Sequence, residues 1–283
     1  MLNLSRPKLF FREGCDQELI WEFSYNLIII LYNEMKALIV GGSSGMGKET
    51  AKLLLKRSVE VVLVASNMDK LQKTKKELEE FGTVSIESVD LYDENQVNDF
   101  IKKIRNDNEH INYLVNSAGK FSPKPFLEHN KEDYDKYLSL NKSTFFITQA
   151  VVENMKKNGG GSIVNIGSMW GKQAIKATPS SAYSMAKAGL HSLTQHLAME
   201  LAEHKIRVNA VSPAVVVTPI YNEFIKPEEV EKTLAGFNDF HPIGRVGRPE
   251  EVASVIDYLL MDKASWITGV IWDVDGGVMA GRN

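Results

Sequence analysis

Short apolar runs alternate with stretches of helical period along most of the 283-residue sequence, and this alternation limits the fold more strongly than any other feature. The apolar, mostly β-branched runs occupy residues 37–40, 61–65, 84–89, 113–115, 162–166, 207–211 and 270–274. Helix-period stretches separate them, at residues 48–57, 69–81, 94–106, 131–157, 182–203 and 249–260. Apolar strands joined by crossover helices are typical of a parallel sheet covered on both faces. The pattern therefore predicts an α/β fold, a doubly wound parallel sheet of about seven strands with helices on both faces.

The first 34 residues differ in pattern from the rest of the chain. Their longest apolar run, Leu27–Tyr32, is far shorter than the ~20 residues of a membrane-spanning helix. Basic residues are followed by acidic ones, and no small-residue cleavage site follows the apolar run, so the layout of a signal peptide is missing. Because a buried strand is predicted directly after Met35, we expect residues 1–34 to be an N-terminal extension and residues 35–283 a single domain. The extension is interpreted as an extra arm, as residues upstream of the natural start, or as a poorly ordered terminus.

Charge and cysteine content argue against several functional classes. Lys and Arg number 33 against 36 Asp and Glu, which gives a formal net charge of −3 and no basic footprint for nucleic acid. The only cysteine, Cys15, excludes an internal disulfide and a cysteine-built metal site, and it suits a reducing compartment such as the cytoplasm. The histidines are scattered and form no HExxH motif, so no metal is expected. The sequence predicts a cytoplasmic protein with neither a nucleic-acid nor a membrane partner.

A glycine-rich turn follows the first predicted strand. It reads Gly41-Gly42-Ser43-Ser44-Gly45-Met46-Gly47 and leads into a stretch of helical period. Glycine allows a tight turn and a close approach of the backbone to a pyrophosphate, whose charge then lies at the helix N-terminus. A flexible loop is the alternative, but the position between strand and helix favours dinucleotide binding. A kinase-type phosphate loop is disfavoured, because Glu49 and not Ser or Thr follows Lys48.

The end of the second predicted strand bears on the choice of dinucleotide. Ser66 and Asn67 lie there, where an acidic residue would bind the ribose 2′-hydroxyl of NAD and an arginine would favour a 2′-phosphate. With no carboxylate to repel the phosphate, and with both side chains able to donate hydrogen bonds, these residues favour NADP(H). NAD(H) is the alternative, because ordinary loop residues would give mixed specificity.

Tyr183 and Lys187 are four residues apart in a predicted helix, a spacing that puts both side chains on one face. A free tyrosine has a pKa of about 10, and a nearby ammonium lowers that pKa by roughly 2–3 units where the tyrosine works near neutral pH. Ser168 lies beyond the carboxyl end of the strand at 162–166, where open α/β sheets bind ligands and a hydroxyl can stabilise a developing alkoxide. Without Ser168 and the glycine-rich turn, Tyr183 and Lys187 have an alternative interpretation, as two residues of a solvent-exposed helix face. A serine hydrolase is disfavoured, because Ser168 lacks the G-x-S-x-G motif.

With these motifs in this order, residues 36–280 resemble the compact, non-extended branch of the short-chain dehydrogenase/reductase (SDR) family. The resemblance is carried by Gly41/Gly45/Gly47, Asp90-Leu91, Asn116-Ser117-Ala118-Gly119, Asn141, Ile166-Gly167-Ser168, Tyr183/Lys187 and Asn209–Pro213 with Thr218-Pro219. It implies a Rossmann-fold catalytic domain at residues 35–283 and a nicotinamide dinucleotide as cofactor. The extended branch would have a glycine at position 44, where this chain has a serine.

The resemblance implies a role for each matched residue. Tyr183 would be the general acid/base, Lys187 would lower its pKa and hold the nicotinamide ribose, and Ser168 would orient the carbonyl. Asn141 would position a water that connects Lys187 to a proton relay, and an asparagine capping a helix turn is the plainer alternative. The other matched positions would contact the cofactor: Asp90 and Leu91 the adenine, Asn116, Ala118 and Gly119 the cleft, and Pro213, Val216 and Thr218 the nicotinamide end.

The substrate pocket is expected under the segment Pro219–His241, between the sixth strand and the last helix. Ala214 stands where the family usually has glycine after Pro213 and is expected to narrow the nicotinamide pocket. The aromatic residues of the region are predicted either to line the pocket or to pack a lid helix or a subunit interface: Phe121, Trp170, Tyr221, Phe224, Phe237 and Phe240.

These features predict hydride transfer between NADP(H) or NAD(H) and a ketone or secondary alcohol, with Tyr183 as acid/base. Candidate substrates are a small free ketone and a carrier-bound 3-oxoacyl group. A catalytically silent nucleotide-binding sensor or scaffold is one alternative, and an epimerase or dehydratase that retains its cofactor is another. The resemblance further implies a homo-oligomer, a tetramer by family analogy, assembled partly through the last strand and tail, Ile271–Asn283.

Overall fold

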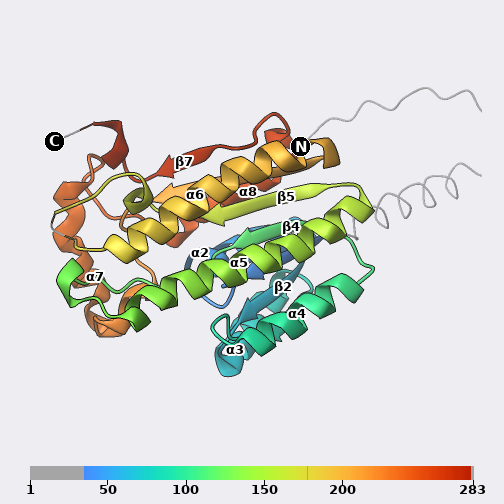
Figure 1. Cartoon of the computed structure of the whole chain (residues 1–283), viewed down its shortest axis with the longest axis horizontal. Helices are drawn as coiled ribbons and strands as arrows, with labels where there is room; N and C mark the ends of the chain where they lie inside the picture. The colour runs from blue at the N-terminus through green and yellow to red at the C-terminus, as the bar shows by residue number, and fades with distance from the viewer. Residues whose placement is uncertain (1–34, 177, 282–283) are drawn as a thin grey trace, which may run out of the picture. The chain divides into compact units, whose positions relative to one another are not determined.

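The computed structural model describes residues 35–176 and 178–281, which contain a seven-stranded sheet (Figure 1). The strand order is β3-β2-β1-β4-β5-β6-β7, and each neighbouring pair is parallel. The strands are β1 (Lys36–Val40), β2 (Glu60–Ala65), β3 (Val84–Ser88), β4 (Ile111–Asn116), β5 (Gly161–Ile166), β6 (Ile206–Pro213) and β7 (Ile271–Val274). The predicted doubly wound parallel sheet is confirmed.

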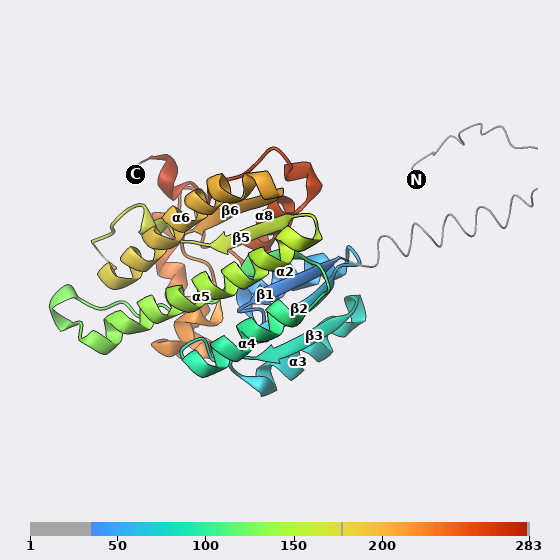
Figure 2. The same ribbon diagram turned by 45° about the vertical axis from the view of Figure 1, so that its right-hand side comes forward.

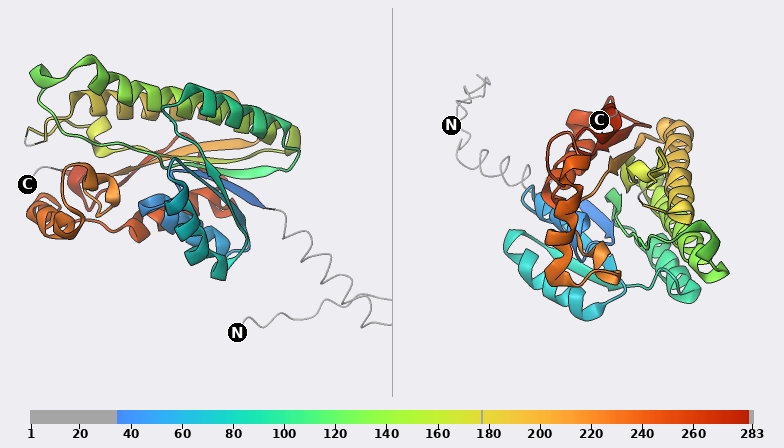
Figure 3. Two further views of the ribbon diagram at one scale, coloured as in Figure 1. Left: turned by 90° about the horizontal axis from the view of Figure 1, so that it is seen from below. Right: turned by 90° about the vertical axis from the view of Figure 1, so that its left-hand side faces the viewer.

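Two layers of helices cover the sheet, one on each face (Figure 3). One layer consists of α2 (Gly45–Leu55), α3 (Met68–Leu78) and α8 (Pro249–Leu260). The other consists of α4 (Glu94–Asn106), α5 (Lys131–Asn158) and α6 (Ser181–Leu201), and α5 and α6 run side by side in both Figure 1 and Figure 2. The short helix α7 (Val230–Leu234) lies in the segment between β6 and α8. The periodicity predicted α4 and α8 to the residue and the other long helices to within about three residues at each end.

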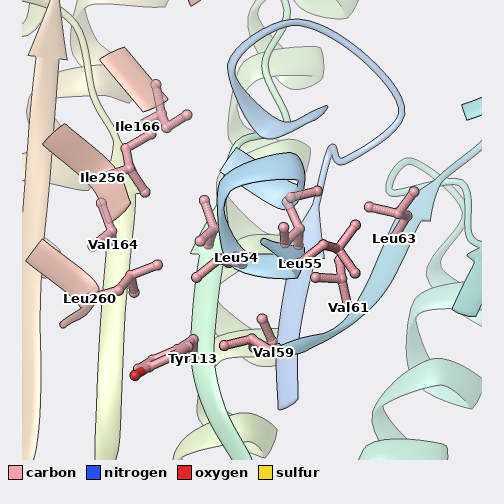
Figure 4. Close-up of a cluster of buried hydrophobic side chains, with 14 of the residues drawn as sticks. Leu54, Leu55, Val59, Val61, Leu63, Tyr113, Val164, Ile166, Ile256 and Leu260 are labelled. Carbon is pink, nitrogen blue, oxygen red and sulfur yellow. The ribbon is translucent and has the colours of Figure 1, made fainter. Parts of the chain in front are cut away.

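Side chains of successive strand residues enter two separate cores, as the two-residue period of a strand requires. In β1, Ala37 and Ile39 pack in the core shared with α2, α3 and α8, whereas Leu38 and Val40 pack in the core shared with α4, α5 and α6. Figure 4 shows part of the first core, where side chains of α2 and α8 meet those of the strands. Both faces of β1 are therefore buried, which explains why this central strand is apolar from Ala37 to Val40.

The direction of winding reverses between β1 and β4, because the chain places β2 on one side of β1 and β4 on the other. Backbone hydrogen bonds continue past the strand ends at this point: the Gly41 N–H donates to the Val64 carbonyl at 2.7 Å and the Ser117 N–H to the Val40 carbonyl at 2.7 Å. In open α/β sheets the crevice at such a switch point is where ligands bind. A ligand-binding crevice is therefore expected between the turns after β1 and β4.

The described residues form one compact unit that starts at Met35. The predicted extension, residues 1–34, lies outside the described residues, as does Cys15, and its interpretation stays a prediction. Within residues 35–176 and 178–281, no helix combines the length and apolar character needed to cross a bilayer. The same residues contain no group of three or more His, Cys, Asp or Glu side chains placed to hold a metal ion.

Candidate active site

The turn after β1 is shaped by two close approaches that only glycine permits. Gly41 has φ +87°, and a Cβ atom added there would lie 2.4 Å from the backbone N of Ala118. A Cβ atom added to Gly47 would lie 2.5 Å from the carbonyl oxygen of Gly41. The first glycine therefore brings the turn against the chain after β4, and the second brings helix α2 against the turn.

The N-terminus of α2 leaves its first amides available to an anion. Ser44 occupies the N-cap position, yet its side chain makes no capping hydrogen bond to the helix. The first turn of α2 contains no acidic residue. Because the first amides of a helix lack partners within it and carry the positive end of its dipole, this terminus suits a phosphate group. The turn and the helix together fit the pyrophosphate of a dinucleotide.

A cleft of about 460 Å³ runs along this turn at the carboxyl ends of the strands. Most of the predicted cofactor contacts line it: Gly41, Ser43, Ser44, Gly45, Met46, Ser66, Asp90, Leu91, Ala118, Gly119 and Thr218. Gly47 and Asn67 do not line it. Gly47 packs beneath the turn, and the Oδ1 atom of Asn67 accepts a hydrogen bond of 2.8 Å from the Lys70 N–H, which caps α3. The structure therefore assigns Asn67 a structural bond that the sequence did not predict.

Ser168 and Tyr183 line a second, smaller cavity of about 60 Å³. This substrate cavity also contains the predicted residues Pro213 and Val216, and it shares Met46 and Thr218 with the cleft. Ser168 follows β5 and is 3% exposed, and Tyr183 comes from the first turn of α6 and is 8% exposed. The tyrosine and the serine, 15 positions apart in the chain, therefore face one buried space.

Tyr183 also borders a third cavity, of about 20 Å³, together with Asn116, Asn141 and Lys187. We call it the relay cavity. Its size is that of about one water molecule. The Lys187 ammonium donates a hydrogen bond of 2.7 Å to the Ile166 carbonyl, and the Asn141 amide donates one of 2.9 Å to the Ala186 carbonyl. The four residues predicted as catalytic thus meet around Tyr183, with Ser168 on one side and Lys187 and Asn141 on the other.

Burial dominates the protonation of Tyr183 and Lys187. It raises the pKa of Tyr183 to about 12, although the Ser168 side chain, as a hydrogen-bonding neighbour, acts to lower it. Burial also lowers the pKa of Lys187 to about 8. Within the protein alone, the pKa of Tyr183 therefore shifts upward, and its decrease beside a bound nicotinamide stays a prediction. A phenolate removed from water loses its hydration, and the Lys187 ammonium bonds a backbone carbonyl and lies 5.8 Å from the tyrosine ring centroid.

Aromatic rings surround the substrate cavity on one side. Phe121 packs edge-on against Tyr183 with ring centroids 4.9 Å apart, and it also contacts Trp170, Tyr221 and Phe224 at centroid distances of 6.0–6.2 Å. Phe121, Trp170 and Tyr221 line the cavity itself. Phe237 and Phe240 do not line it, and they pack against the hydrophobic cluster formed with α7. Three of the rings therefore border the cavity and two pack near α7, and a role of the rings in a lid or a subunit interface stays a prediction.

Two residues at the site carried no signal in the sequence. His191 lies on α6, and its Nε2 atom accepts a hydrogen bond of 3.3 Å from the backbone N–H of Ser168. Lys70 lies on α3 and lines the cleft beside Ser44 and Ser66. A lone histidine or lysine in a helix is ordinary in composition, so only the folded arrangement reveals either contact.

A larger cavity, of about 690 Å³, lies at the opposite, amino-terminal edge of the sheet. It is bordered by Gly160, Ser162, Arg207 and Trp266 among others, and contains none of the predicted catalytic residues. Cavity volume alone would therefore place the functional site at the amino-terminal edge of the sheet. The reversal of winding and the polar side chains instead place it at the carboxyl edge.

Comparison with known proteins agrees with this geometry. The family model described as enoyl-(acyl carrier protein) reductase matches residues 40–279. The 3-oxoacyl-(acyl-carrier-protein) reductase FabG of Thermotoga maritima is 35% identical over 245 residues, which cover 86% of this chain and 96% of that protein. The cyclopentanol dehydrogenase of a Comamonas species is 30% identical over 250 residues, which cover 88% of this chain and 98% of that protein.

Solved structures of related enzymes share the fold of this chain. The L-sorbose reductase of Gluconobacter frateurii, solved in complex with NADPH and L-sorbose, superposes with a TM-score of 0.81. It is 27% identical in sequence, and the match covers 89% of this chain and 98% of that one.

Proposed function

The chain belongs to the short-chain dehydrogenase/reductase family and is an NAD(P)-dependent oxidoreductase of alcohol and ketone groups, and on this premise we propose that it reduces a compact ketone with Tyr183 as proton donor. The observation that carries the proposal is the position of Tyr183 between the substrate cavity, which it shares with Ser168, and the relay cavity, which it shares with Lys187 and Asn141. A proton donor with one face to the substrate and the other to a proton source is what carbonyl reduction requires.

The raised pKa of Tyr183 suits the reductive direction. With its pKa at about 12, the phenol keeps its proton at neutral pH and is ready to donate it. When bound, the nicotinamide supplies the hydride that adds to the carbonyl carbon. The Tyr183 hydroxyl gives its proton to the carbonyl oxygen as negative charge develops there, so ketone, hydride and proton yield the alcohol and a phenolate.

Ser168 orients the same oxygen. Its Oγ atom accepts a hydrogen bond of 3.3 Å from the Trp170 N–H, which leaves the hydroxyl hydrogen free to donate. A donor aimed at the carbonyl oxygen stabilises the charge that forms there during hydride addition. Ser168 and Tyr183 therefore act as two donors on one oxygen.

Lys187 and Asn141 restore the proton that Tyr183 loses. The Lys187 ammonium has three N–H groups, and its bond to the Ile166 carbonyl occupies only one of them. The others are available to the relay cavity and to the phenolate. A water held there by Asn141 connects the ammonium to the cleft, so the tyrosine regains its proton after each turnover.

The size of the substrate cavity favours a compact ketone over a carrier-bound acyl chain. Its volume of about 60 Å³ is bounded by Ala214, Phe121 and Tyr221 among others. Supporting this, one relative is a cyclopentanol dehydrogenase and one structural neighbour holds L-sorbose, both compact molecules. We infer NADP(H) as the preferred cofactor, because the loop after β2 contains Ser66 and Asn67 in place of an acidic residue.

The decisive test is Tyr183→Phe, assayed on a panel of small ketones and 3-oxoacyl thioesters with NADPH and with NADH. The ring packing against Phe121 is retained, so we expect dinucleotide binding, measured by fluorescence, to be unchanged while kcat falls by about 10²–10⁴-fold. Tyr258→Phe on α8, far from the site, is the matched control and should leave kcat unchanged. If wild type binds NADPH but turns over no ketone, the sensor or scaffold alternative is favoured. Catalysis without net consumption of NADPH would favour an epimerase or dehydratase.

Assembly and location complete the proposal. We infer a homo-oligomer, a tetramer by family analogy, in the cytoplasm. Large apolar side chains on the outer faces of α5 and α6 support association: Leu138 (39% exposed), Phe145 (42%), Phe146 (42%), Met185 (55%) and Met199 (83%). Trp272 of the last strand, 40% exposed, supports the predicted role of that strand. A monomer in sedimentation velocity would contradict this inference.

A further inference from the structure

Lys70 reaches from α3 back to the glycine-rich turn. Its backbone N–H is fixed by the cap bond to Asn67, which places the residue in the first turn of the helix. Helical side chains lean toward the N-terminus of their helix, and the Lys70 ammonium accordingly lies against the cleft. There it donates a hydrogen bond of 3.1 Å to the Oγ atom of Ser44, 26 positions away in the chain.

This bond accounts for the missing cap of α2. Ser44 occupies the N-cap position, where a serine hydroxyl ordinarily accepts a hydrogen bond from the second or third amide of its helix. Here the hydroxyl makes no such bond and accepts one from Lys70 instead. The contact therefore ties the turn after β1 to the helix after β2, the two segments that enclose the ribose end of the cleft.

The charge of Lys70 lacks a counter-charge within the described part of the chain. Other lysines in the same region form ion pairs, Lys48 with Glu77 and Lys75 with Glu79, the latter at 3.5 Å. Among residues 35–176 and 178–281, no carboxylate lies within 4 Å of the Lys70 ammonium. Partial burial lowers its pKa, and no acidic group counteracts this. Lys70 is exposed overall, and an ammonium that lines the cleft without a carboxylate partner is stabilised by a bound anion.

The surroundings identify that anion. Ser44, Ser66 and Lys70 all line the cleft; Lys70 contacts Ser44, and Ser66 directly follows β2. In this fold the end of the second strand is where the adenosine ribose of a dinucleotide lies, and a cation there accommodates a 2′-phosphate. Ser44 and Ser66 carry no charge, and Lys70 is the one basic residue among those that line the cleft in the described part of the chain.

We propose that Lys70 is the residue by which this chain recognises the 2′-phosphate of NADP(H), with the hydroxyls of Ser44 and Ser66 as additional donors. The inference rests on the proposed function only in that a dinucleotide binds in the cleft. The ammonium exchanges its bond to Ser44 for a charge-assisted bond to the phosphate, and Ser44 is released to donate to the same group. A lysine on the helix thus replaces a basic residue on the loop.

The test measures binding with two ligands that have no nicotinamide and so undergo no turnover. We expect wild type to bind 2′-phospho-ADP-ribose more tightly than ADP-ribose in calorimetry. Lys70→Gln should weaken binding of the phosphorylated ligand by about 10- to 100-fold, the effect of one charge-assisted hydrogen bond, and leave ADP-ribose binding unchanged. Lys70→Arg should retain the preference. Lys76→Gln, which removes an exposed charge farther along the same helix, is the matched control and should change neither constant.

The outcomes separate this inference from the proposed function. If Lys70→Gln leaves both constants unchanged, or weakens both ligands equally, Lys70 does not read the 2′-phosphate, and the oxidoreductase proposal stands. If wild type binds neither ligand and no dinucleotide, both proposals fail. If Lys76→Gln removes the preference for the phosphorylated ligand as completely as Lys70→Gln does, binding depends only on the overall charge of α3. That result would also overturn the inference.

Discussion

The backbone N–H of Ser168 donates a hydrogen bond of 3.3 Å to the Nε2 atom of His191. The two residues belong to the turn after β5 and to the middle of α6, and they meet because Gly167 has no side chain. A Cβ atom added to Gly167 would lie 2.1 Å from the same Nε2 atom. An Nε2 atom that accepts a hydrogen bond belongs to a neutral imidazole with its proton on Nδ1. The relationship therefore makes the placement of Ser168, the proposed carbonyl-orienting residue, depend on an uncharged histidine.

The first prediction concerns stability in mild acid. Burial lowers the pKa of His191 to about 4, with the nearby charges of Lys172 and Lys187 acting in the same direction and Asp273 opposing them. The unfolded chain, with an ordinary histidine pKa of about 6.5, binds the proton more readily, so stability falls as pH decreases below that value. We expect this histidine to contribute a loss of about 2 kcal/mol in the free energy of unfolding between pH 7 and pH 5.

Urea unfolding of wild type and His191→Asn at both pH values measures this contribution. The variant lacks the titrating group, so the difference in stability between the two proteins should shrink by about the same 2 kcal/mol on acidification. Acidic groups elsewhere affect both proteins alike and cancel in the comparison. An equal loss of stability in wild type and variant would contradict the prediction.

The second prediction concerns the glycine beneath the turn. In Gly47→Ala the added methyl group would lie 2.5 Å from the Gly41 carbonyl oxygen, a backbone atom that moves only with the turn itself. We expect a loss of about 1–3 kcal/mol in unfolding free energy and weaker dinucleotide binding, because α2 is pushed away from the strand. Gly236→Ala is the matched control, since nothing lies within 4 Å of its added Cβ atom. A dinucleotide affinity in Gly47→Ala equal to wild type would contradict the assigned role.

The sequence predicted those parts of the molecule that follow from local pattern and winding. Periodicity located the strands and helices, and the rule that parallel strands end at one edge brought Ser168 near Tyr183. Contacts between segments far apart in the sequence could not be predicted. For example, no residue near Lys70 indicates that the Lys70 ammonium contacts Ser44. The effect of burial on protonation was also beyond the sequence, because the pKa of Tyr183 depends on how completely the fold buries the ring, and the spacing to Lys187 carries no information about burial.

The third prediction concerns substrate size. The methyl group of Ala214 borders the substrate cavity of about 60 Å³ and also a neighbouring cavity of about 290 Å³. Ala214→Gly removes that wall, so we expect kcat/KM for ketones one or two methylenes larger to rise by about 10-fold relative to the smallest substrate. Ratios of kcat/KM across a ketone series measure this and cancel any general loss of activity. A ratio that stays constant would mean that the cavity does not limit size at Ala214.

The fourth prediction concerns the pH dependence of reduction. With a pKa of about 8, Lys187 is mostly protonated at pH 7 and loses its proton above pH 8, whereas Tyr183, with a pKa of about 12, stays protonated throughout. If the ammonium supplies the relay, only its protonated form is competent, and kcat/KM for the dinucleotide in ketone reduction should be about tenfold lower at pH 9 than at pH 7. Lys187→Arg keeps its charge over this range, so its profile should be flat even where its rate is lower. A decline that persists in Lys187→Arg would assign the titration to another group. A wild-type profile that stays level to pH 9.5 would mean that the loss of the lysine proton has no effect on reduction.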